Sequence, residues 1–241
     1  VGDRWSFLLL RDAFLGVRAL MATAWASMVD VLHLVAAVGA LVLALWQLSR
    51  GRDGARTPAL RACAVALIIS ALWSCSVIAL GGSMVLTDLL LSASYLAWLW
   101  LLYRLFAADP RGKGLGPIRA VVAALAFVEL LQMAIALAGF GQAEAGVLEA
   151  ELLILRFAAI FRLLFCIGAL VLAHNLYVGA SRETRQSLRW PEAALGLTWL
   201  YDLNLFTIAY LLDALPVLLA QLRGAVMLAA VALLALGTFR N

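Results

Sequence analysis

Residues 117–140 read PIRAVVAALAFVELLQMAIALAGF, a run in which only Arg119 and Glu129 carry a charge. At a rise of about 1.5 Å per residue, a helix of this length crosses the hydrocarbon core of a bilayer, which is roughly 30 Å thick. The run therefore predicts a transmembrane helix with a carboxylate near its middle.

The composition of the whole chain extends this interpretation. Of its 241 residues, 66% are hydrophobic and 13% are charged, and the mean hydropathy is +1.02. These values exclude a soluble globular domain and a disordered chain, and three cysteines are too few for a disulfide scaffold. The apolar residues form long blocks, whereas a β-barrel would show alternating stretches of about ten residues, so we expect an all-α integral membrane protein.

Six further blocks are long enough to span a membrane, which predicts a seven-transmembrane helix bundle. They cover residues 29–49, 59–80, 84–106, 150–178, 190–212 and 217–239. All five prolines, Pro191 among them, fall at or beside the ends of these blocks, where a helix tolerates proline. We therefore take residues 28–241 as one seven-span module.

The charges of the connections predict the orientation of this module. The first, third and fifth connections are rich in arginine, whereas the second, fourth and sixth carry no basic residue. Basic loops stay on the cytoplasmic side, so the first span should begin outside and Asn241 should lie inside.

Residues 1–27 do not follow this charge pattern. Arg4, Arg11 and Arg18 recur every seven residues, opposite an apolar helix face. Two interpretations remain open: an amphipathic helix lying on the outer membrane surface, or a non-native extension upstream of a start at Met28.

Ionisable residues inside a membrane are costly and are therefore candidates for a functional site. Glu129, Arg162 and Asp202 each lie some 15–18 Å from an end of their block, at the middle of the bilayer. Because the blocks of Glu129 and Arg162 are consecutive and antiparallel, we expect these two residues to pair, with Asp202 as a second carboxylate for the same guanidinium. We expect Gln132 and Asn204 to join this polar cluster. The cluster could be an ion pair that fixes helix register, or a site that senses a ligand or a proton.

Several chemistries can be excluded from the residues. The single lysine, Lys113, lies in a loop, so a retinal Schiff base has no partner, and His33 and His174 fall near opposite membrane faces, which excludes a bis-histidine haem. No catalytic set, metal motif or phosphate-binding loop is present. We therefore expect no cofactor, no metal site and no nucleic-acid partner, with the lipid bilayer as the partner of the apolar surface.

Four short stretches resemble a known family of sensor proteins. They are CIGALVLAHNLY at 166–177, LYDLNLF at 200–206, the Arg223-Gly224 pair leading to Arg240-Asn241, and AWLWLLYRL at 97–105. Together they resemble the N-terminal membrane region of the histidine kinases associated with PEP-CTERM and exosortase systems, the PrsK type. The likeness covers about residues 28–241 and is strongest from residue 166 onward.

This resemblance implies a multi-pass sensor of the bacterial inner membrane that acts in a two-component system. It implies a cytoplasmic kinase domain C-terminal to Asn241, and by analogy a homodimer. The chain departs from the family because it has no phosphoacceptor histidine box and no ATP-binding lid. We therefore expect an excised membrane module or a stand-alone relative, with no catalytic residue of its own.

A different class of function remains as the alternative, a small multi-span transporter or permease subunit. In that case Glu129, Arg162 and Asp202 would line a substrate path. Transporters typically show internal repeats and helices broken by glycine or proline near mid-span, and the sequence shows neither.

Overall fold

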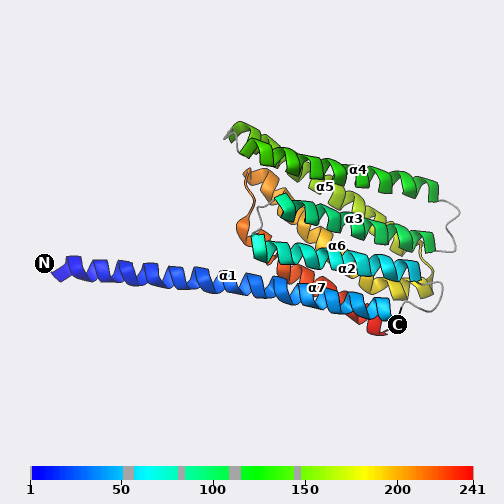
Figure 1. Ribbon diagram of the computed structural model, residues 1–241, viewed down its shortest axis with the longest axis horizontal. Coiled ribbons are helices and arrows are strands. Elements are labelled where there is room, and N and C mark those ends of the chain that lie inside the picture. Colours follow the sequence, from blue (N-terminus) through cyan, green and yellow to red (C-terminus); the bar gives the residue numbers. More distant parts are fainter. Residues whose placement is uncertain (1, 51–56, 81–84, 109–114, 144–147, 241) are drawn as a thin grey trace.

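The computed structural model describes residues 2–50, 57–80, 85–108, 115–143 and 148–240 of the chain. In these ranges it contains seven α-helices (Figure 1): α1 (Gly2–Arg50), α2 (Thr57–Leu80), α3 (Val85–Ala108), α4 (Leu115–Ala143), α5 (Leu148–Gly179), α6 (Arg182–Leu212) and α7 (Val217–Arg240). Each includes a segment long and apolar enough to cross a membrane. The prediction of an all-α, seven-span membrane bundle is confirmed.

The helices run up and down in chain order and form a closed ring. Each packs against its neighbours in sequence, α1 packs against α7 to close the ring, and α3 also contacts α5. Successive helices alternate in direction. The C-terminal ends of α1, α3, α5 and α7 therefore lie together at one end of the bundle, with the N-terminal ends of α2, α4 and α6 (Figure 1). We call this the basic end, since its connections carry the arginines, and we call the other the opposite end.

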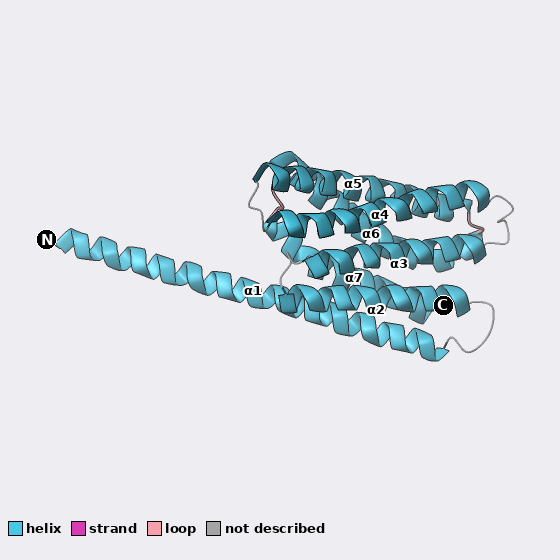
Figure 2. Cartoon of the chain, turned by 45° about the horizontal axis from the view of Figure 1, so that its top comes forward, coloured by secondary structure: helices cyan, strands magenta, loops and turns pink. Residues whose placement is uncertain are grey.

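The first helix is much longer than the others. It continues without a break from Gly2 to Arg50, and its N-terminal turns project beyond the bundle (Figure 2). The apolar segment Thr23–Ser49 of α1 is long enough to span a membrane and includes the block expected at residues 29–49. Nothing in the helix marks residue 28 as a boundary, and both interpretations of residues 1–27 stay predictions.

The sixth helix begins earlier than expected, and this corrects the placement of one proline. Ser181 caps the helix, since its side-chain oxygen accepts a hydrogen bond of 3.2 Å from the backbone N–H of Thr184. The arginine-rich turns after Ser181 are helical although they are too polar to count as part of a span. Pro191 consequently lies inside α6 and not at its start.

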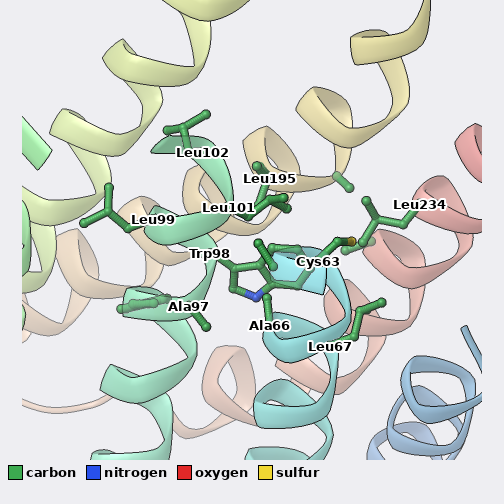
Figure 3. Close-up of a cluster of buried hydrophobic side chains, with 14 of the residues drawn as sticks. Cys63, Ala66, Leu67, Ala97, Trp98, Leu99, Leu101, Leu102, Leu195 and Leu234 are labelled. Atoms are coloured by element: carbon green, nitrogen blue, oxygen red, sulfur yellow. The ribbon is translucent and has the colours of Figure 1, made fainter. Parts of the chain in front are cut away.

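Small residues allow the helices to approach closely. Ala36, Ala40 and Ala44 of α1 and Ala62 and Ala66 of α2 are completely buried, and these helices pack against each other, α1 also against α7 and α2 also against α3. A second part of the core joins α2, α3, α6 and α7, and Figure 3 shows Cys63, Leu67, Trp98, Leu195 and Leu234 in it. Large apolar side chains such as those of Val42, Leu45 and Leu211 are exposed on the outer surface, as a helix facing lipid requires.

Candidate functional site: a buried network of charged residues

The predicted pair of Glu129 and Arg162 is present at the middle of the bundle. Nη1 of Arg162 on α5 lies 2.6 Å from Oε2 of Glu129 on α4, and the two side chains are 2% and 0% exposed. The second guanidinium nitrogen, Nη2, donates a hydrogen bond of 2.8 Å to the hydroxyl of Ser92 on α3. The matched depth of α4 and α5 brings these charges together, as the sequence predicts.

Asp202 does not share the guanidinium of Arg162, and this part of the expected cluster is corrected. Its Oδ1 lies 2.7 Å from Nε of Arg223 on α7, while Asp202 is 1% and Arg223 12% exposed. Helices α6 and α7 are consecutive and antiparallel, so Asp202 finds a cation on its own neighbouring helix. The site therefore contains two ion pairs, each between consecutive helices.

Tyr95 of α3 joins these two pairs. Its hydroxyl donates a hydrogen bond to Oδ2 of Asp202 and accepts one of 2.6 Å from Nη2 of Arg223. Its ring lies under the guanidinium of Arg162, with Cζ 4.7 Å from the ring centroid. Phe165 stacks on the ring at 5.0 Å and holds it in place.

We define the charge network as Ser92, Tyr95, Glu129, Arg162, Asp202 and Arg223. It takes residues from five helices, α3 to α7, and its two acids balance its two arginines. Removing such charges from water costs several kcal/mol each, and close pairing with further hydrogen bonds offsets that cost. The network therefore restricts how the five helices can sit against one another.

The two amides expected in the cluster behave differently. Gln132 is buried, and its Oε1 has no hydrogen-bond partner among the described residues. Asn204 is exposed, and its Nδ2 donates a hydrogen bond of 2.9 Å to the carbonyl of Leu200 on the same helix. Two residues correspond to about 200° around a helix, so Asn204 faces away from the side on which Asp202 is buried, and the expectation for Asn204 is wrong.

The network extends towards α1 and α2 through aromatic contacts. Cζ of Arg223 lies 5.2 Å from the ring centroid of Trp73 on α2, and the buried ring of His33 on α1 meets Trp73 edge-on at 5.4 Å. Both ring nitrogens of His33 lack a hydrogen-bond partner among the described residues. At Gly224 an added Cβ would lie 2.7 Å from Cδ2 of His33, so only glycine permits this approach of α7.

The sequence reasoning missed Arg223, Tyr95 and His33 as members of this region. Only the order of the helices pointed to Arg223, since its helix follows that of Asp202 directly, whereas its depth of six residues inside α7 does not match that of Asp202. No signal existed for Tyr95, because one tyrosine among apolar residues resembles ordinary core. His33 was placed near a membrane face because the first span was taken to begin at residue 29, whereas in the structure its ring lies against Gly224 of α7.

A third ion pair joins α5 and α6 outside the network, at the opposite end. Nε and Nη2 of Arg156 donate hydrogen bonds of 2.6 Å each to the two carboxylate oxygens of Asp213. The side chains are 53% and 38% exposed, and Asp213 ends α6 with a left-handed backbone, φ 51°. Hydrogen bonding by Arg156 holds the pKa of Asp213 below its ordinary range.

The described residues offer no group of three or more histidine, cysteine, aspartate or glutamate side chains that could hold a metal ion. Comparisons with models of protein families, with curated proteins and with solved structures found no significant match. The buried charge network in the seven-helix membrane bundle is therefore the candidate functional site.

Proposed function

We propose that the chain is a membrane-embedded sensory module, as its resemblance to the input region of PrsK-type histidine kinases implies. In this proposal the charge network couples helices α3 to α6 to helix α7. The observation that supports it most is the Asp202–Arg223 pair, because it ties α7 to the buried network at a distance of 2.7 Å. Helix α7 ends at the basic end, where the sequence predicts the cytoplasm and a kinase domain would follow.

The physical argument concerns what happens when α7 moves. A shift of one helical turn, about 5.4 Å, would separate Arg223 from Asp202 and from the hydroxyl of Tyr95. A buried charge without its partner costs about 3–5 kcal/mol, so α7 favours discrete positions over continuous sliding. A stimulus that changes a charge or contact in α3 to α6 therefore changes the preferred position of α7.

The transporter alternative has less support from the geometry. Transporter sites are typically built where helices are interrupted near mid-membrane. Here α4, α5 and α6 continue as helix through Glu129, Arg162 and Asp202, and Pro191 lies in the part of α6 nearest the basic end.

The proposal can be tested by measuring movement of α7 in vesicles. Spin labels at Ala107 on α3 and Phe239 on α7 report the distance between these helices at the basic end, in a chain whose three cysteines are replaced by alanine. We expect Asp202→Asn to shift or broaden this distance distribution. The matched control Asp213→Asn makes the same chemical change on α6 outside the network and should leave the distribution unchanged.

A second measurement addresses the output. In a protein that joins residues 1–241 to a histidine kinase domain, Asp202→Asn should change autophosphorylation several-fold, and Asp213→Asn should not. Equal kinase output and equal label distances for both variants would contradict the sensory proposal. Ion or solute flux in proteoliposomes that is lost in Glu129→Gln would support the transporter instead.

A further inference from the structure

Helix α7 packs against α6 on one side and against α1 on the other, and the contacts with α1 lie outside the charge network. Nε1 of Trp25 on α1 donates a hydrogen bond of 2.6 Å to Oε1 of Gln221 on α7. Further along both helices, the ring of His33 lies against Gly224. We call these two contacts the α1–α7 seam.

His33 is buried in this seam without a hydrogen bond. Its side chain is 1% exposed, and neither Nδ1 nor Nε2 has a partner among the described residues. The backbone of α7 lies directly against the ring, since an added Cβ at Gly224 would be 2.7 Å from Cδ2 and 3.0 Å from Nε2. A neutral imidazole here lacks one donor bond and one acceptor bond, whereas an imidazolium would bury a charge and two donors without an acceptor.

The charges around His33 also disfavour an imidazolium. Helix α1 packs against α2 and α7. From α7 the guanidinium of Arg223 acts on the ring, and from α1 itself Asp30 does, with the repulsion by Arg223 the larger of the two effects. Arg223 is already paired with Asp202, and α2 presents the uncharged ring of Trp73, over which the guanidinium of Arg223 lies. The seam as it is packed therefore requires a neutral His33.

A proton can approach this ring from the opposite end. Asp30 lies three residues before His33, which is towards the opposite end, and its side chain is exposed. Residues three apart are neighbours on a helix surface, so Asp30 offers a proton acceptor between the solvent and the ring. The other charged residues of α2 and α7, Arg61 and Arg240, lie near the basic end and leave this route open.

We propose that His33 is a proton-binding site and that acidification at the opposite end is the stimulus of the module. This inference rests on the sensory function proposed above and adds its ligand. An imidazolium at His33 finds no acceptor in the seam and repels Arg223, so the position of α7 in which Gly224 covers the ring becomes unfavourable. Because Arg223 is the residue before Gly224, a movement of α7 at the seam reaches the Asp202–Arg223 pair.

The direction of the pH dependence follows from where the proton can bind. The packed seam offers an imidazolium no acceptor, whereas an open seam exposes a ring with the ordinary histidine pKa of about 6.5. Protons therefore favour the open seam, and its population rises as the pH falls through that value. For one histidine, the ratio of open to packed seam should increase about tenfold from about pH 7.5 to about pH 5.5.

Nitrogen NMR of the imidazole rings, with the whole chain in lipid nanodiscs, tests the protonation directly. The chain has two histidines, so His174→Gln leaves only the signals of His33. We expect a neutral ring at about pH 7.5 and the signals of an imidazolium as the pH falls below about 6.5. A His33 that is still neutral at about pH 5 would overturn the proposal.

The spin labels at Ala107 and Phe239 test whether this proton moves α7. In the chain without cysteines, the distance distribution should shift when the pH is lowered to about 5.5. His33→Leu removes the titrating ring and should abolish the shift, while the matched control His174→Gln should retain it. Gly224→Ala should give the shifted distribution already at neutral pH, because the added methyl group displaces the ring of His33.

The outcomes distinguish this inference from the sensory function on which it rests. A distribution that does not respond to pH, but still shifts in Asp202→Asn, would overturn the proton as the stimulus and leave the sensory function intact. A pH response that persists in His33→Leu would overturn the assignment to His33. If neither low pH nor Asp202→Asn shifts the distribution, both proposals fail. If His33→Leu does not fold, the NMR titration and Gly224→Ala still decide.

Discussion

The buried pair Glu129–Arg162 and the exposed pair Arg156–Asp213 have the same chemistry and the same N–O distance of 2.6 Å. They differ in their surroundings, because the first pair is 0–2% exposed and the second pair is 38–53% exposed. Water screens the exposed charges and offers each one an alternative partner, whereas the buried charges have each other, the hydroxyl of Ser92 and the ring of Tyr95. The contribution of an ion pair to the stability of this protein therefore depends on its burial and cannot be judged from the N–O distance alone.

The largest expected effect comes from removing one member of the fully buried pair. Arg162→Met leaves the carboxylate of Glu129 buried without a cation, which should cost about 3–5 kcal/mol of unfolding free energy. Unfolding by sodium dodecyl sulfate in mixed micelles measures this loss. The double variant Glu129→Leu with Arg162→Met should recover most of the lost unfolding free energy. A double variant as unstable as Arg162→Met alone would contradict the view that an unpaired buried carboxylate causes the loss.

A smaller loss is expected at the second pair, because Arg223 is partly accessible. Arg223→Gln should lower the unfolding free energy by roughly 2–3 kcal/mol, since Asp202 keeps its hydrogen bond from Tyr95. The same unfolding assay measures it. A loss as large as that of Arg162→Met would show that the exposure of Arg223 does not reduce its contribution.

Tyr95→Phe removes only the hydroxyl, which is hydrogen-bonded to both members of the Asp202–Arg223 pair. The ring keeps its contacts with Arg162 and Phe165, while Asp202 and Arg223 each lose one hydrogen bond. We expect a loss of about 1–2 kcal/mol in the same assay. Phe165→Leu is a useful control, because it disturbs the stacking on Tyr95 without removing a hydrogen bond of the network.

The smallest effect is expected for the exposed pair, where Asp213→Asn should leave the midpoint of thermal unfolding at neutral pH unchanged within experimental scatter. Because the pKa of Asp213 is lowered in the folded chain, whatever the pair contributes is fully present above the ordinary aspartate pKa of about 3.9. It disappears as the pH falls through the lowered pKa of the folded state. A clear drop in the midpoint at pH 7 would show that the exposed pair contributes as the buried ones do.

The fold could be predicted from the sequence because long apolar blocks and alternating loop charges are direct consequences of crossing a bilayer. The boundaries were less predictable where helix continues into polar sequence, as it does between Ser181 and Pro191. Hydropathy reports what contacts lipid and does not report where backbone hydrogen bonding starts.

The candidate site could be predicted only where depth and helix order were sufficient. Glu129 and Arg162 lie mid-block on consecutive helices, and their pairing followed from that. Arg223 lies six residues inside its helix, a position from which a long arginine side chain ordinarily reaches the membrane surface, so its turn towards Asp202 could not be read from its depth alone. Tyr95 of α3 contacts Asp202 of α6 and Arg223 of α7, which lie more than 100 residues away in the sequence, and no local sequence pattern predicts such a contact.

The most direct test of the network is a pair of double-mutant cycles that ask which arginine is coupled to Asp202. Asp202→Asn is combined with Arg223→Gln in one cycle and with Arg162→Gln in the other, and unfolding free energies are measured in mixed micelles. The arrangement of the helices predicts a coupling of roughly 1.5–3 kcal/mol for Arg223 and a clearly smaller one for Arg162. A larger coupling to Arg162 would contradict the pairing of Asp202 with Arg223. Asp202 would then belong with Glu129 and Arg162, and α7 would not be tied to the network.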